Sequence, residues 1–252
     1  MRRILTLAAV AVAAFALADV AHETLGHGGM CAALGGKVLY VSTTFEDCSI
    51  RSWVIDGAGP CGGILAALLC WLWLATAPPR SGAARAFLLL GFAFAAFWNF
   101  GYLIKSGLTD QGDWAFVIAG LKPALLWHAA ITVAGIALYW ISLRMLAAMM
   151  RRHLGSEEAA SLPPFAFSLI AYGAAASIAC AGALFDPRGP ATILSDALPS
   201  SLGAIGLPLA GALLARTAPK LRLALPGSFG WIAAGTIAGI AFVALLGPGL
   251  RL

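Results

Sequence analysis

Seven long apolar runs separated by short polar segments dominate the pattern of this chain. Each run has close to the ~20 residues that an α-helix needs to cross the hydrocarbon core of a bilayer. The pattern therefore predicts an all-α polytopic membrane protein whose first helix continues beyond its apolar run to about residue 34. The expected apolar runs are 4–20, 61–78, 84–104, 124–146, 165–185, 202–218 and 229–246.

The composition agrees with this prediction. Hydrophobic residues make up 61% of the chain and charged residues 11%, whereas charged residues make up about a quarter of a soluble domain. We expect one integral membrane domain over residues 1–252, in three parts: 1–78, 84–146 and 165–252. The net charge of +5 comes from Lys and Arg dispersed among loops, so membrane topology explains it better than a nucleic-acid partner does.

The basic residues also predict an orientation. With the N-terminus inside, the cytoplasmic segments hold ten Lys and Arg and the opposite segments hold six. This asymmetry follows the positive-inside rule. The first run also fits a signal peptide cleaved after Ala18, but cleavage would leave His22 at a mobile terminus, so we favour an uncleaved helix. The Ala- and Gly-rich composition, without an organelle signal, favours the inner membrane of a bacterium.

A small β-hairpin is expected between the first two spans. The β-branched runs 36–45 and 50–55 follow a Gly-Gly turn and flank a short polar segment. The hairpin either pairs with an extended peptide or caps a site. The five Cys include no C-x-x-C pair, which argues against a thiolate zinc site, and Cys48 could pair with Cys61 if their loop faces an oxidising compartment.

The most distinctive stretch lies at the end of the first run, where His22-Glu23-Thr24-Leu25-Gly26-His27 places two imidazoles beside a carboxylate. Imidazole is a good zinc ligand, and Glu23 stands where a metal-bound water would find a general base. Residues five apart lie roughly 140° apart on a regular helix. The spacing therefore predicts a widened, π-type turn over residues 24–27, made inexpensive by Gly26. The motif lies ~27 Å along the first helix, near the non-cytoplasmic edge of the core.

A catalytic zinc site takes three protein ligands and keeps one position for water. The segment that leaves the third span on the same predicted side as the two His contains the best candidates for the third ligand. Asp113 is our first choice, because Gly112 precedes it and a short apolar stretch follows it. The alternative ligands are Asp110, His128 and Asp196. Each also has a structural interpretation: turn or cap residues for Asp110 and Asp113, a helix N-cap for Asp196, and a backbone hydrogen bond for His128.

Two further residues are expected to support the ligands. Asp19 lies one turn before His22 and is predicted to accept an imidazole N–H, while Asn99 is predicted to orient a ligand or a substrate carbonyl. In the polar segment 151–164, His153 and the pair Glu157 and Glu158 are expected to be solvated.

Three motifs in this order resemble a known family: H-E-T-L-G-H-G at 22–28, A-A-L-G-G-K-V at 32–38, and A-G-P at 58–60 opening an apolar helix. The order is similar to that of the site-2 protease family of intramembrane zinc metallopeptidases, over roughly residues 4–78. The family's metal motif is one residue shorter, and its N-P-x-P-x-x-D-G element, which supplies the third ligand, is absent here. The longer H-E-x-x-G-H form resembles the zinc motif of dipeptidyl peptidase III, a soluble enzyme.

The residues and the resemblance together predict a zinc-dependent peptidase that hydrolyses transmembrane or membrane-proximal peptides, with His22, His27 and Asp113 holding Zn and Glu23 moving the proton. One alternative is a non-catalytic membrane protein of the same architecture that binds a metal or a partner. Another is a zinc-dependent lipid amidase. Glu23 separates the first alternative from the enzymes, because metal binding alone does not need it.

Overall fold

The computed structural model describes residues 1–156 and 161–252, and confirms an all-α polytopic membrane protein. The described part of the chain contains seven helices that are long and apolar enough to cross a bilayer. The predicted pair Glu157 and Glu158 lies outside the described residues. The spans are Arg2–Ala33, Trp53–Thr76, Gly82–Thr109, Ala124–Leu154, Pro164–Ala183, Ile193–Thr217 and Phe229–Leu246.

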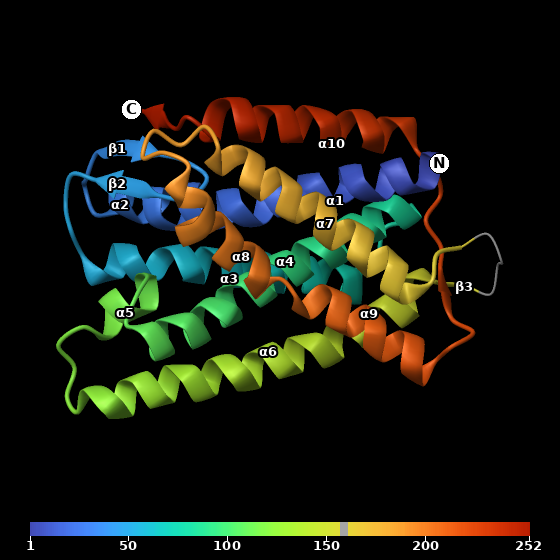
Figure 1. Ribbon diagram of the computed structural model, residues 1–252, viewed down its shortest axis with the longest axis horizontal. Helices are drawn as coiled ribbons and strands as arrows, with labels where there is room; N and C mark the ends of the chain where they lie inside the picture. Colours follow the sequence, from blue (N-terminus) through green and yellow to red (C-terminus); the bar gives the residue numbers. More distant parts are fainter. Residues whose placement is uncertain (157–160) are drawn as a thin grey trace.

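The spans run roughly along the long axis of the molecule, with α6 and α10 at opposite edges (Figure 1). The first span is continuous and consists of α1 (Arg2–Val20), a π-helical segment η1 (Ala21–Gly28) and α2 (Gly29–Ala33). The remaining helices are α3 (Trp53–Thr76), α4 (Gly82–Thr109), α5 (Asp113–Ile118), α6 (Ala124–Leu154), α7 (Pro164–Ala183), η2 (Ile193–Ala197), α8 (Leu198–Gly203), α9 (Gly206–Thr217), α10 (Phe229–Ala241) and η3 (Phe242–Leu246).

The core lies around α1 and α4. Leu7 and Val10 of α1 and Phe94 of α4 are fully buried, and the ring of Phe15 meets Phe94 edge-on with centroids 5.8 Å apart. The outer helix α6, by contrast, exposes large apolar side chains such as Leu125. An apolar exterior is what a bilayer solvates, whereas the side chains of α1 and α4 form the centre of the buried core.

Helix α3 packs unusually close to η1 because glycines line both sides of the crossing. A Cβ atom on Gly26 would lie 2.6 Å from the Cα of Gly59, and one on Gly62 would collide with the carbonyl of Ala21. Small residues of this kind allow the backbones of two membrane helices to touch. The A-G-P segment therefore brings the first turns of α3 against the His-containing π-turn.

The predicted hairpin is present, but its second strand was misplaced. β1 (Val38–Val41) pairs antiparallel with β2 (Glu46–Cys48), and β5 (Leu250–Arg251) pairs with the other edge of β1. Residues 50–55 do not form the expected strand, because the side chain of Ser52 accepts a hydrogen bond from the Val54 amide and caps α3. Helix α3 thus begins at Trp53, earlier than the expected 61. β3 (Gly155–Ser156) and β4 (Arg222–Leu223) form a second small sheet.

Two other expectations were wrong. Cys48 forms a disulfide with Cys31, which joins β2 to α2, and Cys61 is a free thiol inside α3. His153 is not a solvated loop residue, because it lies in the last turn of α6 with only 8% of its surface exposed.

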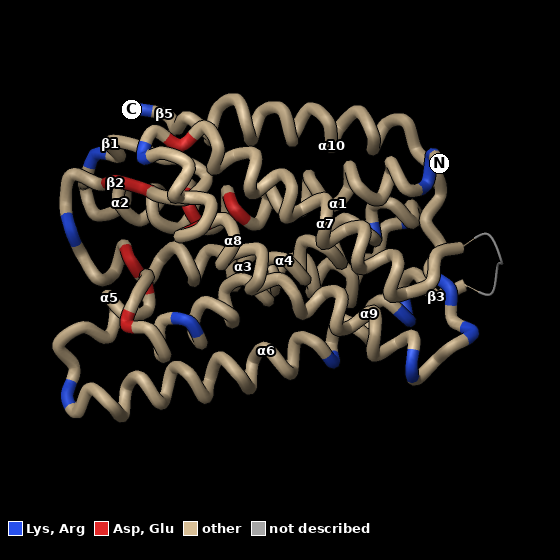
Figure 2. The backbone as a smooth tube through the Cα atoms, in the orientation of Figure 1, with Lys and Arg blue, Asp and Glu red and all other residues tan. Residues whose placement is uncertain are grey.

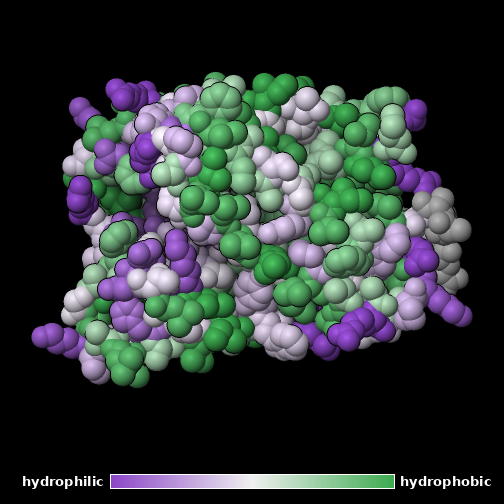
Figure 3. All heavy atoms as spheres, in the orientation of Figure 1, coloured by the Kyte–Doolittle hydropathy of each residue, from purple (hydrophilic) through white to green (hydrophobic). Residues whose placement is uncertain are grey.

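Charges are segregated along the long axis. The described Asp and Glu all lie in the half of the molecule that contains β1 and β2, whereas Lys and Arg occur at both ends (Figure 2). In the space-filling view, hydrophilic side chains gather toward the two ends and hydrophobic ones cover much of the surface between them (Figure 3). The acidic end therefore contains every described carboxylate that could join the two His.

Candidate metal centre

The predicted widened turn is confirmed. The π-helical segment η1 covers Ala21–Gly28 and includes the whole of residues 24–27. A π-turn hydrogen-bonds residues five apart, so it aligns side chains that a regular helix would separate. His22 and His27 consequently face each other with ring centroids 5.0 Å apart, and they are only 2% and 7% exposed.

Asp113 completes a cluster with the two imidazoles. Its Oδ2 lies 3.1 Å from His22 Nε2 and 3.4 Å from His27 Nε2. Asp113 is the first residue of α5, and Gly112 before it has φ of 88°, in the left-handed region that favours glycine. A Cβ atom at Gly112 would also collide with the hydroxyl of Tyr102, so the glycine allows this loop to fold tightly onto α4.

Hydrogen bonds on the far side of each ring fix the tautomers. His27 Nδ1 donates to the carbonyl of Ile55 at 2.8 Å. His22 Nδ1 lies 3.1 Å from Asn99 Oδ1, while Asn99 Nδ2 donates to the carbonyl of Ala95. Because the amide nitrogen of Asn99 is engaged by a carbonyl, its oxygen faces His22 and accepts the Nδ1 proton. In the neutral rings both Nε2 atoms therefore direct lone pairs at Asp113.

Three atoms with available lone pairs therefore converge: Nε2 of His22, Nε2 of His27 and Oδ2 of Asp113. Such an arrangement needs a positive charge, which either protons or a metal ion can supply. Two ligands on a tetrahedral zinc ion with bonds of about 2.0–2.1 Å are separated by about 3.3 Å. The distances from Asp113 Oδ2 to the two Nε2 atoms, 3.1 and 3.4 Å, fit that value. The donor set of two imidazoles and one carboxylate is also one that zinc accepts.

The carboxyl of Asp113 is held ionised. Burial raises the pKa of this carboxyl. Hydrogen bonds and charge attraction from His22 and His27 in their protonated forms lower it by more, so in the absence of metal the net pKa lies well below that of an ordinary Asp. Asp113 therefore meets the requirement that a carboxylate ligand be deprotonated.

A cavity of about 240 Å³ opens beside the cluster. Glu23 lines it, is 6% exposed, and places Oε1 3.9 Å from His22 Nε2. The indole of Trp98 stacks on the His22 ring with centroids 4.8 Å apart and forms part of the wall. Other lining side chains with polar or charged groups are Thr43, Thr44, Glu46, Asp56, Tyr102, Lys105, Arg188, Asp196 and Ser200.

The alternative third ligands have other partners than the two clustered His. Asp110 ends α4 in the left-handed conformation, and its Oδ1 lies 3.6 Å from His128 Nε2, so these two residues pair with each other. Asp196 lines the cavity, but its Oδ2 lies 3.5 Å from Arg188 Nη2. It is not the predicted N-cap, because it lies inside η2 and the N-cap of α8 is Ala197.

The two predicted supporting residues differ in outcome. Asn99 contacts His22 directly, as described above. Asp19 is 2% exposed, and its Oδ1 has no hydrogen-bond partner among residues 1–156 and 161–252. The expectation that Asp19 accepts an imidazole N–H was wrong, because Asn99 and the Ile55 carbonyl occupy both Nδ1 positions.

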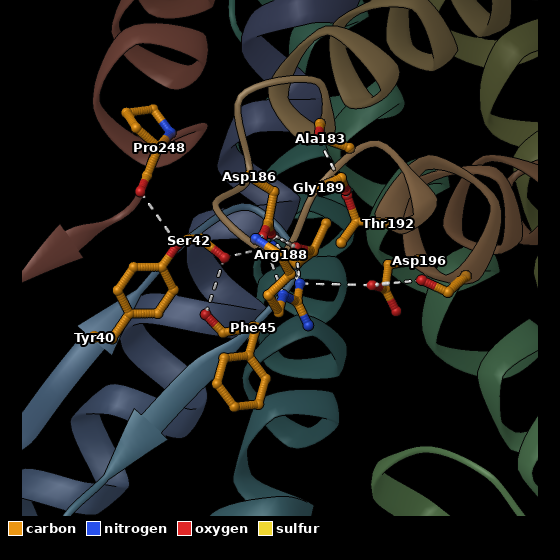
Figure 4. Close-up of polar contacts among 12 residues, drawn as sticks. Tyr40, Ser42, Phe45, Ala183, Asp186, Arg188, Gly189, Thr192, Asp196 and Pro248 are labelled. Carbon is orange, nitrogen blue, oxygen red and sulfur yellow. Dashed lines mark hydrogen bonds and ion pairs between the residues drawn. The ribbon is translucent and has the colours of Figure 1, made fainter.

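Sequence reasoning missed a polar network over the cavity, centred on Arg188 (Figure 4). Arg188 Nη2 donates to Asp186 Oδ2 at 2.9 Å and also to the hydroxyl of Thr44. Burial raises the pKa of Asp186, but hydrogen bonds from Arg188 and Thr44 lower it more, so the carboxyl stays ionised. The network ties the loop after α7 to the turn between β1 and β2. The only sequence signal was an Asp-Pro-Arg triplet that interrupts an apolar region.

Fold and cluster define the class of this protein: a polytopic membrane protein with a buried His–His–Asp group beside a glutamate-lined cavity. No protein-family model, curated protein or solved structure matches the chain.

Proposed function

We propose that this protein is a membrane-embedded zinc-dependent peptidase. The observation that carries the proposal is the convergence of three lone-pair atoms, from His22, His27 and Asp113, next to the buried carboxylate of Glu23. A purely structural ion cluster would need no further carboxylate in the lining of the adjacent cavity.

Each residue has a distinct role in this proposal. His22, His27 and Asp113 would hold a zinc ion, which would supply Lewis-acid chemistry to polarise a carbonyl and activate water. Glu23 accepts a proton from the attacking water and passes it to the leaving amine. Asn99 and the Ile55 carbonyl hold the two imidazoles in the tautomer that presents Nε2.

Resemblance to the site-2 protease family supports the peptidase assignment over the other hydrolases. The A-G-P segment of α3 packs on the metal-motif helix here. In this proposal Asp113, whose Oδ2 lies 3.1 Å from His22 Nε2, supplies the third ligand in place of the family's missing downstream element. The cavity lies at one end of the bundle and is lined by Phe45 and Phe116 as well as polar groups. We propose transmembrane or membrane-proximal peptides as the substrates.

We also propose that the site faces the non-cytoplasmic side of a bacterial inner membrane. The Cys31–Cys48 disulfide lies at the same end as the cavity, and disulfides persist in oxidising compartments. Arg2, Arg151 and Arg152 lie at the opposite end, as the positive-inside rule requires for a cytoplasmic face.

Activity of the Glu23→Gln variant tests the proposal. This substitution keeps the side chain's size and removes its capacity to accept a proton. We expect zinc content equal to wild type and at least a hundredfold loss of peptide hydrolysis, the low end of what positioned acid–base catalysis contributes. Asp47→Asn, which removes an exposed carboxylate at the same end, serves as the matched control.

Three outcomes would contradict the peptidase proposal. Unchanged turnover in Glu23→Gln would exclude Glu23 as the base. Zinc binding by wild type, without hydrolysis of any membrane-protein or peptide substrate in a library, would favour the non-catalytic alternative. Hydrolysis of lipid amides in place of peptides would identify the lipid amidase.

A further inference from the structure

A second cavity, of about 570 Å³, lies between α6 and α9 at the end of the molecule opposite the His–His–Asp cluster. It is lined by three arginines and by apolar side chains, and none of its lining residues is a carboxylate. Hydrophilic side chains gather on the surface near the facing ends of these helices (Figure 3). The lining residues are Arg144, Ala147, Ala148, Arg151, Arg152, Leu213, Leu214 and Thr217.

The arginines are arranged on one side of α6. Arg144 and Arg151 are seven residues apart, so they lie on nearly the same face of the helix, and Arg152 adjoins them. Ala147 and Ala148 lie between them, and their small side chains leave the hollow open. In the part of the chain that the structure describes, no carboxylate lies within ion-pair distance of these guanidinium groups.

The position of the three arginines along α6 corresponds to the level of the lipid headgroups. Helix α6 has 31 residues and is about 46 Å long, compared with about 30 Å for the hydrocarbon core. Arg144 is about 30 Å from the start of α6. Trp140, one turn earlier, is 59% exposed, and exposed Trp is enriched at the membrane interface.

The residues that line this cavity suit an amphiphilic ligand better than a free anion. A guanidinium forms paired hydrogen bonds with phosphate oxygens, and basic pockets between membrane helices suit anionic headgroups. Leu213 and Leu214 would have no role in binding inorganic phosphate, but they would pack against the first acyl carbons of a phospholipid. We propose that this cavity binds an anionic phospholipid, with its phosphate held by Arg144, Arg151 and Arg152.

Native mass spectrometry with added phosphatidylglycerol or phosphatidylcholine tests this site. We expect wild type to retain phosphatidylglycerol preferentially. Each Arg near an anionic headgroup contributes about fivefold in affinity, so the Arg144→Gln/Arg151→Gln double variant should bind phosphatidylglycerol about thirtyfold more weakly. The control Arg80→Gln/Lys220→Gln removes two exposed positive charges at the same end outside the cavity and should retain the lipid.

A third variant keeps the test informative if the double variant is unstable. Ala148→Phe fills the hollow from an exposed position without changing charge, and should also lose phosphatidylglycerol. An equal loss in the Arg80/Lys220 control, or full retention in Ala148→Phe, would overturn the assignment. Displacement of the lipid by equimolar inorganic phosphate would show a free-anion site. Zinc content should be unchanged in all these variants, so the result is independent of the proposed peptidase activity.

Discussion

Removing the hydrogen-bond acceptor behind His22 should weaken metal binding by a predictable amount. In Asn99→Leu the buried Nδ1–H of His22 loses the oxygen that lies 3.1 Å away. An unsatisfied buried donor costs about 1–3 kcal/mol, and the ring can avoid that cost by moving its proton to Nε2, which then cannot bind zinc. Both routes lower zinc affinity by roughly 10–100-fold, the range measured for partners of metal-bound His.

Competition with a chromogenic chelator at pH 7 would measure this affinity in detergent. Ser106→Ala is the matched control, because Ser106 is buried on the same helix and its Oγ has no hydrogen-bond partner in the described part of the chain. We expect wild-type zinc affinity in that control. If folded Asn99→Leu bound zinc as tightly as wild type, the inference that Asn99 fixes the His22 tautomer would be refuted.

Two further predictions concern the walls of the site. Gly59→Ala should abolish zinc binding, because its Cβ would collide with the His27 imidazole, whereas Gly173→Ala, which meets nothing within 4 Å, should bind zinc normally in the same chelator assay. Burial raises the pKa of Glu46 from 4.5 to about 6, so the folded protein loses stability relative to the unfolded chain as the pH rises through this range and the buried carboxyl ionises. Glu46→Gln should therefore raise Tm at pH 7.5 but not at pH 4.5, and Asp47→Asn should raise it at neither pH; a Tm gain that did not depend on pH would contradict the assignment.

Much of the fold was predictable because the length of an apolar run is by itself enough to predict a membrane span. The span at 229–246 was predicted to the residue, and the first span continues nearly as far as expected. The second span begins earlier because Ser52 caps it, a local hydrogen bond that hydropathy does not detect. The disulfide was mispaired for a related reason: Cys61 lies inside α3, whereas Cys31 lies at the end of the first span, next to the hairpin.

The site was partly predictable for a different reason. Two His five residues apart can share one face only through a π-turn, so the spacing itself predicted η1. Asp113 was preferred over Asp110 because Gly112 precedes it and an apolar stretch follows it. The sequence did not show that α4 ends at Thr109 or that Gly112 turns the chain back over Tyr102. The partners of the imidazoles could not be fully predicted, because one of them is the backbone carbonyl of Ile55, which has no side-chain signature.

Zinc content per chain tests the central claim most directly, by elemental analysis of protein purified in detergent without chelators. The account predicts about one zinc ion in wild type, loss of the metal in His22→Ala, His27→Ala and Asp113→Ala, and retention in Asp110→Ala. The last variant removes a carboxylate from the same loop that pairs with His128 instead. Wild-type protein without zinc, or equal loss in the Asp110 and Asp113 variants, would contradict a metal centre built from His22, His27 and Asp113.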